Sequence, residues 1–307
     1  MNKKGFLDIS FSWIFAFIIG GFIIFGAVYG LNKFTDIEQT KSSAVSGTEF
    51  GNILNTFETS SEAATSVAIT FPLQSRLQFD CISRGTFGKQ DIIIDELVNN
   101  KWSDTGFSIA LKNKYVFSEN FIEGKNFYAF SKPFKFPFKV ANLIYLTLGE
   151  KNYCFIDPPR KIKSEINDLN QINLITKECT DKTAIRICFD GGSDCDIEVD
   201  YNGDFLIKDD ETFPFEGDAM MYAAIFSDKE TYECGVKRLM SRTEGLSELY
   251  MDKSIFLANR CDSRLGADLG SFKSLLENYK SSEGLSQLVK TKDLLDSKNK
   301  YSGCKLW

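Results

Sequence analysis

One uncharged hydrophobic segment constrains this chain more than any other feature. Residues 9–32 read ISFSWIFAFIIGGFIIFGAVYGLN, and they lie between Asp8 and Lys33 with no charged residue of their own. At a rise of about 1.5 Å per residue, the strongly apolar part from Phe11 to Leu31 matches the roughly 30 Å hydrocarbon core of a bilayer. The sequence therefore predicts a single transmembrane helix over residues 9–32, preceded by a short N-terminus at 1–8.

Composition restricts what the rest of the chain can do. The first 32 residues carry a side-chain net charge of +1 (Lys3, Lys4 and Asp8), so the net charge of −6 for the whole chain leaves −7 on the remainder. This acidic balance argues against a nucleic-acid partner. The chain has no histidine, which excludes Ser-His-Asp and Cys-His catalysis and imidazole metal sites. We expect no cofactor and no metal, name no catalytic residue, and leave a small-molecule ligand open.

The cysteines indicate an oxidising compartment. All eight follow the hydrophobic segment, and none form a C-x-x-C pair, so scattered disulfides are favoured over a zinc site. Buried free thiols are the alternative. Local spacing favours a Cys188–Cys195 pair across the FDGGSD turn. A Cys261–Cys304 pair that fastens the C-terminal tail is plausible, and the connectivity of the other cysteines is not deducible. The disulfide candidates are Cys81, Cys154, Cys179, Cys188, Cys195, Cys234, Cys261 and Cys304.

The same cysteines indicate how the predicted transmembrane helix is oriented across the membrane. Lys3 and Lys4 precede the segment, as the positive-inside rule expects for a cytoplasmic N-terminus, but Lys33 and Lys41 follow it. The charge difference is therefore small, and the cysteines decide for a single-pass cell-membrane protein with its bulk outside the cytoplasm. A cleaved secretory signal has an apolar core of about 7–15 residues and a small-residue cleavage site. This core is longer and lacks that site, so an uncleaved anchor is preferred.

The first residues also resemble a known signal. Lys3-Lys4-Gly5-Phe6 before a long hydrophobic helix is similar to the class III signal of type IV pilin-like proteins. That resemblance implies cleavage between Gly5 and Phe6 and a helix that packs against copies of itself. The chain departs from the family at the fifth mature position, where Ser10 replaces the usual Glu, while Asp8 occupies the third. A plain signal anchor is the alternative.

A second resemblance covers most of the chain. The KKGFLDISFSWIFAFIIG start, the FEGDAMMYAAIFSD segment and the Cys304-Lys-Leu-Trp307 end resemble uncharacterised single-anchor surface proteins of small-genome archaea. This resemblance implies a membrane anchor and extracytoplasmic disulfides. It implies no activity.

Apolar periodicity divides the remaining chain into three parts. Residues 33–66 are polar with weak helical spacing and predict a juxtamembrane helix or stalk. Residues 67–226 contain alternating and apolar runs typical of strands, with one short charged helix at RKIKSEINDLNQ and a hairpin at Asn202-Gly203. Residues 227–307 predict helices at about 228–258, 271–280 and 284–297, the first behind an S-x-x-E capping box at Ser227. We expect an α+β fold with a predominantly antiparallel β-rich region.

Two groups of acids are candidates for chemistry. Glu216 and Asp218 precede an uncharged apolar run, where burial could raise the pKa of a carboxyl group. A second group around residues 190–211 invites a calcium interpretation, although its spacing does not match an EF-hand loop and its alternation is typical of the solvated face of a strand.

These observations favour a membrane-anchored extracytoplasmic protein of structural, adhesive or assembly type that acts through protein partners or self-assembly. A pilin-like subunit is a special case of this hypothesis. The alternatives are an anchored, carboxylate-dependent enzyme acting on cell-surface polysaccharide, and a receptor or solute-binding ectodomain.

Overall fold

The computed structural model describes residues 11–59, 65–85, 87–103, 108–189, 191–192, 194–258, 261 and 265–307. Within the long first helix, the side chains of residues 11, 12, 32, 34–46 and 59 are not described. The N-terminus at 1–8 and the cleavage positions Gly5 and Phe6 lie outside the described residues.

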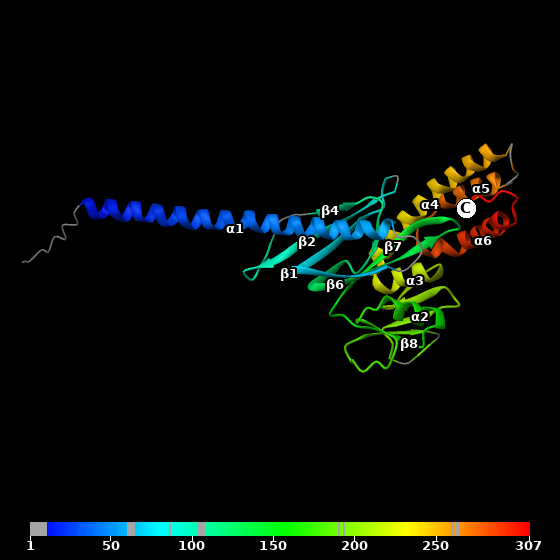
Figure 1. Ribbon diagram of the computed structural model, residues 1–307, viewed down its shortest axis with the longest axis horizontal. Helices are drawn as coiled ribbons and strands as arrows, with labels where there is room; N and C mark the ends of the chain where they lie inside the picture. The colour runs from blue at the N-terminus through cyan, green and yellow to red at the C-terminus, as the bar shows by residue number, and fades with distance from the viewer. Residues whose placement is uncertain are drawn as a thin grey trace, which may run out of the picture.

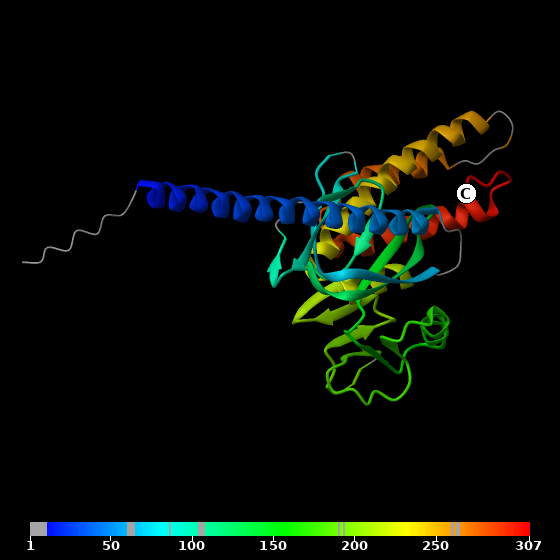
Figure 2. The same cartoon turned by 60° about the vertical axis from the view of Figure 1, so that its left-hand side comes forward.

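One helix, α1 (Phe11–Thr59), contains residues 11–32 of the predicted transmembrane segment and most of the predicted stalk, whereas residues 9 and 10 lie outside the described residues. Its 49 residues give a length of about 73 Å at the standard helical rise. Gly47 and Gly51 do not interrupt it. Figures 1 and 2 show its first half projecting away from the rest of the molecule and its second half lying against it. The two sequence segments are therefore one continuous helix.

The first sheet has the strand order β3-β2-β1-β6-β7-β5, with β4 also paired to β2. Its pairings are antiparallel except for β5 with β7. The strands are β1 (Thr65–Ile82), β2 (Lys89–Val98), β3 (Lys101–Trp102), β4 (Ser108–Leu111), β5 (Tyr115–Phe117), β6 (Phe121–Lys135) and β7 (Lys139–Leu148).

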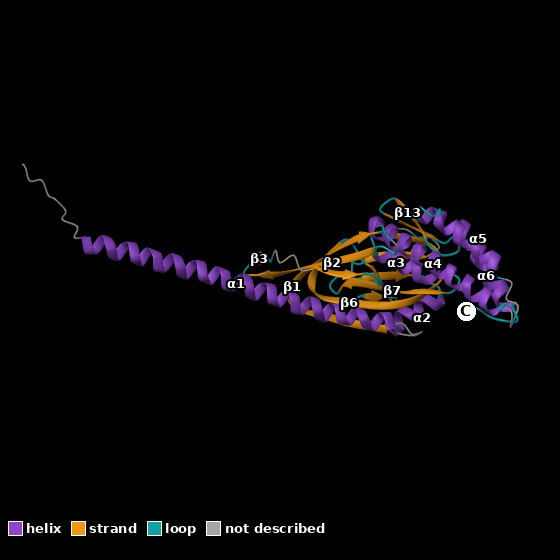
Figure 3. Ribbon diagram, turned by 90° about the horizontal axis from the view of Figure 1, so that it is seen from above, coloured by secondary structure: helices purple, strands orange, loops and turns teal. Residues whose placement is uncertain are grey.

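Both faces of this sheet are covered. Alternate residues of β7 belong to two different cores: Ile144 packs with α1, and Tyr145 packs with the C-terminal helices. Figure 3 shows the strands between α1 on one side and α3 and α4 on the other. The aromatic run at the β6–β7 connection is part of the second core, because Phe134, Phe136 and Phe138 are buried.

The second sheet has the order β13-β12-β11-β10-β8-β9 and is mixed rather than predominantly antiparallel. β10 is parallel to both β8 and β11, and β8 is parallel to β9. Parallel neighbours need a crossover, and α2 (Arg160–Leu169) supplies one between β8 and β9. The hairpin predicted at Asn202-Gly203 is present between β11 and β12. The strands are β8 (Tyr153–Ile156), β9 (Leu174–Ile175), β10 (Ile185–Phe189), β11 (Ile197–Asp200), β12 (Phe205–Lys208) and β13 (Glu211–Pro214).

The C-terminal part is helical, as the periodicity predicted. The apolar run after Gly217 is the buried helix α3 (Gly217–Phe226). It is followed by α4 (Lys229–Leu257), α5 (Gly266–Glu277), the short 3-10 helix η1 (Ser282–Gly284) and α6 (Leu285–Tyr301). The predicted N-cap of α4 is wrong by one residue, because Asp228 rather than Ser227 accepts from the Thr231 N–H at 2.9 Å. The α+β fold class is confirmed.

Candidate functional site: the long helix and its braced attachment

The exposed half of α1 is apolar on every side. Trp13–Leu31 is the one membrane-spanning candidate among the described residues, with a mean hydropathy of 2.4 and no buried residue. Phe22 and Phe25 on neighbouring turns are 73% and 71% exposed. A helix that is apolar all round needs lipid or other helices around it. The molecule itself does not cover this surface.

The other half of α1 is part of the protein core. Phe50, Leu54 and Phe57 recur at steps of four and three residues and are fully buried. The Phe50 ring lies 5.9 Å from that of Phe71 on β1, which in turn meets Phe127 of β6 edge-on. Burying a large apolar side chain contributes about 1.5–3 kcal/mol. These contacts fix α1 to the sheet.

A side chain of β7 caps the last turn of α1. The Asn142 side chain donates to the carbonyl of Phe57 at 2.7 Å and to that of Glu58 at 3.3 Å. These are two of the carbonyls that a helix end leaves without an intrahelical partner. The Lys114 ammonium adds an ion pair with Glu58 at 3.3 Å. The end of α1 is thus held by hydrogen bonds as well as by packing.

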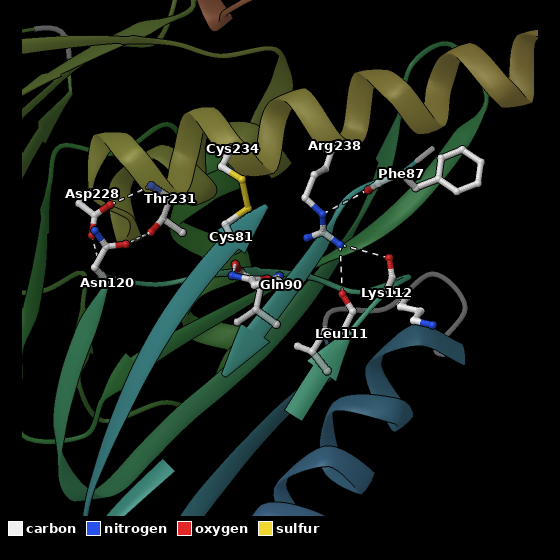
Figure 4. Close-up of a disulfide and its surroundings, with 11 residues drawn as sticks. Cys81, Phe87, Gln90, Leu111, Lys112, Asn120, Asp228, Thr231, Cys234 and Arg238 are labelled. Carbon is white, nitrogen blue, oxygen red and sulfur yellow. Dashed lines mark hydrogen bonds between the residues drawn. A yellow bond between two sulfur atoms is a disulfide. The ribbon is translucent and has the colours of Figure 1, made fainter. Parts of the chain in front are cut away.

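On the opposite face of the first sheet, a disulfide and a hydrogen bond at its N-cap residue hold α4 (Figure 4). Cys81 of β1 and Cys234 of α4 pair across 153 residues, with a Cα–Cα distance of 6.1 Å. At the start of α4, Asp228 accepts from the Asn120 N–H at 2.5 Å. Nearby, the Gln90 side chain bonds both backbone groups of Val116 and secures β2 to β5.

Arg238, one turn beyond Cys234, is buried and bonded to carbonyl groups. It donates to the Phe87, Leu111 and Lys112 oxygens at 3.2–3.3 Å, as Figure 4 shows. Its guanidinium also lies 4.7 Å from the Tyr115 ring centre. Burial lowers the pKa of Arg238, and the Tyr115 phenol acts in the opposite direction. These hydrogen bonds from the Arg238 side chain attach α4 to the loop after β1 and to the end of β4.

The remaining cysteines form three more disulfides. Cys154 of β8 pairs with Cys179, and Cys188 of β10 pairs with Cys195, at Cα–Cα distances of 6.1 Å and 5.9 Å. Cys261–Cys304, at 5.6 Å, ties the segment after α4 to the C-terminal tail. The Cys188–Cys195 and Cys261–Cys304 pairs that the sequence favoured are therefore present. All of these distances are within the usual disulfide range of about 4.4–6.8 Å. The long-range pair was not deducible from the sequence.

Asp218, the first candidate for acid–base chemistry, has its negative charge paired with lysine side chains and serves a structural role. Its carboxylate contacts Lys132 at 3.6 Å, accepts from the Tyr201 hydroxyl at 2.8 Å and pairs with Lys161. Burial alone would raise the pKa of Asp218, but the bonds from Lys161 and Tyr201 and the charge of Lys132 outweigh it and lower the pKa. The expectation of a raised pKa at this carboxyl group is therefore wrong.

Glu216, the second candidate acid, pairs with Lys292 at 2.7 Å. These two carboxylates join α3 to neighbouring elements: Lys132 lies on β6, Lys161 on α2 and Lys292 on α6. The geometry is that of a bridge between parts of the fold.

The acids around residues 190–211 are likewise part of turns and strand faces. Asp196 accepts from the backbone N–H of Arg186, and Asp200 accepts from that of Gly203, each at 2.7 Å. Glu198 is exposed between buried Ile197 and Val199. Within the described ranges, no three acidic or cysteine side chains converge in a group able to hold a metal ion. Asp190 lies outside the described residues.

Comparison with known proteins adds no further identification. No family model matches the chain, and neither a curated protein nor a solved structure shows significant similarity to it. The fold itself defines an α+β protein with one apolar N-terminal helix and four disulfides, features found in secreted or anchored proteins.

Proposed function

We propose that this chain is a membrane-anchored extracytoplasmic structural protein that acts through protein contacts. The observation that carries the proposal is the two-part character of α1. None of the 19 residues Trp13–Leu31 is buried, whereas Phe50, Leu54 and Phe57 of the same helix are core residues. An anchor joined to a domain by a flexible linker would hold that domain loosely. A continuous helix holds it at a defined angle and distance.

The four disulfides support an extracytoplasmic position for the body, because disulfides persist mainly in oxidising compartments. With the body outside, the N-terminus is cytoplasmic and the chain crosses the membrane once. The ion pairs of Asp218 and Glu216 favour a structural role over carboxylate catalysis, since neither acid is left with an unpaired charge.

The unbroken α1 favours the assembly form of this function. A helix that continues without interruption from lipid into the domain can pack along copies of itself, as the resemblance of Lys3-Lys4-Gly5-Phe6 to a pilin-like signal implies. In this form the mature chain begins at Phe6 and the exposed apolar half of α1 lies in the interior of a filament.

Two measurements test this proposal. N-terminal sequencing of the protein purified from cells should give Phe6 as the first residue, and immunogold labelling should show lines of label extending from the envelope. A start at Met1 with diffuse envelope label would contradict assembly and leave the plain anchor. Label confined to the cytoplasm of sectioned cells would contradict both forms.

A further inference from the structure

The hairpin formed by β2 and β3 projects from the end of the first sheet that is nearest to the exposed half of α1. Figure 3 shows β3 at this end, level with the middle of α1. The two strands are joined by Asn99 and Asn100, which are exposed and have φ angles of 50° and 63°. Two consecutive residues with positive φ are typical of the tight turn of a β-hairpin.

Contacts along α1 show which way this hairpin points. A Cβ atom added at Gly51 of α1 would lie 3.9 Å from the Ile109 side chain of β4. Lys114, three residues after the end of β4, pairs with Glu58 in the last turn of α1. The strand β4 therefore runs in the same direction as α1. Because β2 is antiparallel to β4, β2 runs back toward the exposed half of α1.

The length of β2 sets the level that the hairpin reaches. Ile92 of β2 lies opposite Ile109, and the strand continues for six more residues to Val98. At about 3.3 Å per residue these six cover about 20 Å, which corresponds to about 13 residues of helix. The turn is therefore about level with residue 38 of α1, roughly 10 Å beyond Leu31, the last residue of the membrane-spanning candidate.

The headgroup layer of a bilayer fills most of this distance. A total thickness of about 40–45 Å around a hydrocarbon core of about 30 Å leaves roughly 5–8 Å of headgroups on each side. Lys101, directly after the turn, is exposed and long enough to reach this layer. The Trp102 ring follows and is held 4.1 Å from the Arg76 guanidinium. Tryptophan is enriched at membrane–water interfaces, and lysine side chains extend to them.

We propose that the β2–β3 hairpin contacts the lipid headgroups of the membrane that α1 crosses. The ammonium of Lys101 and the side-chain amides of Asn99 and Asn100 donate to headgroup oxygens, and Trp102 lies at the outer margin of the layer. This contact lies beside the axis of α1, so it limits how the body tilts and rotates about its anchor. The inference rests on the anchoring proposed above and adds a second surface that touches the membrane.

Fluorescence quenching tests the contact, because the chain has three tryptophans at different levels. Trp13 belongs to the anchor and Trp102 to the hairpin, whereas Trp307 packs on Tyr250 at the C-terminal end, far from the exposed half of α1 (Figure 1). Three full-length variants each keep one tryptophan and carry phenylalanine at the other two positions. They are reconstituted in phosphatidylcholine vesicles with and without a nitroxide on the headgroup. We expect the nitroxide to quench Trp13 and Trp102 and to leave the emission of Trp307 unchanged.

Lengthening α1 tests whether its length sets the contact. Seven alanines inserted after residue 41 extend the helix by about 10 Å and rotate the body by only about 20° relative to two full turns. The insertion precedes the buried residues Phe50, Leu54 and Phe57, so the body keeps its packing on α1. In this variant the nitroxide should no longer quench Trp102, while Trp13 should be quenched as before.

Quenching of Trp102 that the insertion removes supports the contact. If Trp13 is quenched but Trp102 is quenched no more than Trp307, or if the insertion leaves Trp102 quenched, the contact is wrong and the anchor stands. An unquenched Trp13 would instead contradict the anchor. Should the lengthened chain fail to fold, the comparison of Trp102 with Trp307 at the original length decides the question.

Discussion

The Cys81–Cys234 disulfide gives the sharpest quantitative prediction. Breaking it with Cys81→Ala and Cys234→Ala releases a loop with a sequence separation of 153, whereas Cys188→Ala with Cys195→Ala releases one of 7. If a disulfide acts mainly by restricting the unfolded chain, its contribution grows with the logarithm of loop length. The long loop then contributes about 5 kcal/mol and the short loop about 2.4 kcal/mol. The nested disulfides shorten the long loop only slightly on this logarithmic scale.

Urea unfolding of the full chain in detergent, followed by tryptophan fluorescence, measures this difference. We expect the long-range variant to lose about twice as much unfolding free energy as the short-range variant. A reduced but still substantial stability in the long-range variant would reflect the remaining contacts of α4, including Arg238. Equal losses, or a larger loss for the Cys188–Cys195 variant, would refute the loop-entropy reasoning.

Three further predictions use the same unfolding assay. Gly235→Ala should lower the unfolding free energy by about 1–3 kcal/mol, because the added Cβ would lie 2.6 Å from the Phe117 ring. The control is Gly270→Ala, whose added Cβ would lie 3.8 Å from its nearest neighbour, and it should leave the unfolding free energy unchanged or raise it by up to about 1 kcal/mol. A destabilised control would contradict this packing argument. Asp228→Ala should cost about 1 kcal/mol through loss of the α4 N-cap, and an unchanged midpoint would count against that cap. Asp218 has a lowered pKa in the folded state, so its contribution is present above about pH 4 and is lost as the pH falls through that lower value. The Asp218→Asn variant should therefore lose less stability than the parent below about pH 4, and parallel pH profiles would contradict this.

The elements that the sequence predicted well are those with strong local signals. The apolar run within 9–32, the helical periodicity of α4 and the Asn202-Gly203 turn each depend on neighbouring residues, and the structure has a helix over residues 11–32, a helix at α4 and a hairpin at that turn. The Cys188–Cys195 disulfide, with a separation of 7, follows the same logic.

The features that the sequence did not reveal depend on long-range contacts. Nothing near Cys81 or Cys234 indicates their pairing, because the topology of the first sheet brings them together. The parallel pairings of β10 with β8 and β11 could not be read from its own residues. Asp218 stands before an apolar run that indicated desolvation, but its lysine partners come from β6 and α2.

The predicted stalk shows the same limit. The weak and irregular apolar spacing of residues 33–66 predicts a juxtamembrane helix or stalk, but it does not indicate what that helix packs against. Its last turns belong to α1, and Phe50, Leu54 and Phe57 are buried in the core because β1, β6 and β7 lie against them.

The central claim is that α1 anchors a disulfide-bonded body outside the cytoplasm. Intact cells should be treated with a membrane-impermeant maleimide before and after a membrane-impermeant reductant, and the labelled cysteines located by mass spectrometry. We expect no label without reductant, because the cysteines are paired, and label on the cysteines of the body after reduction without lysis. Cysteines that react only after lysis, and without reductant, would contradict it.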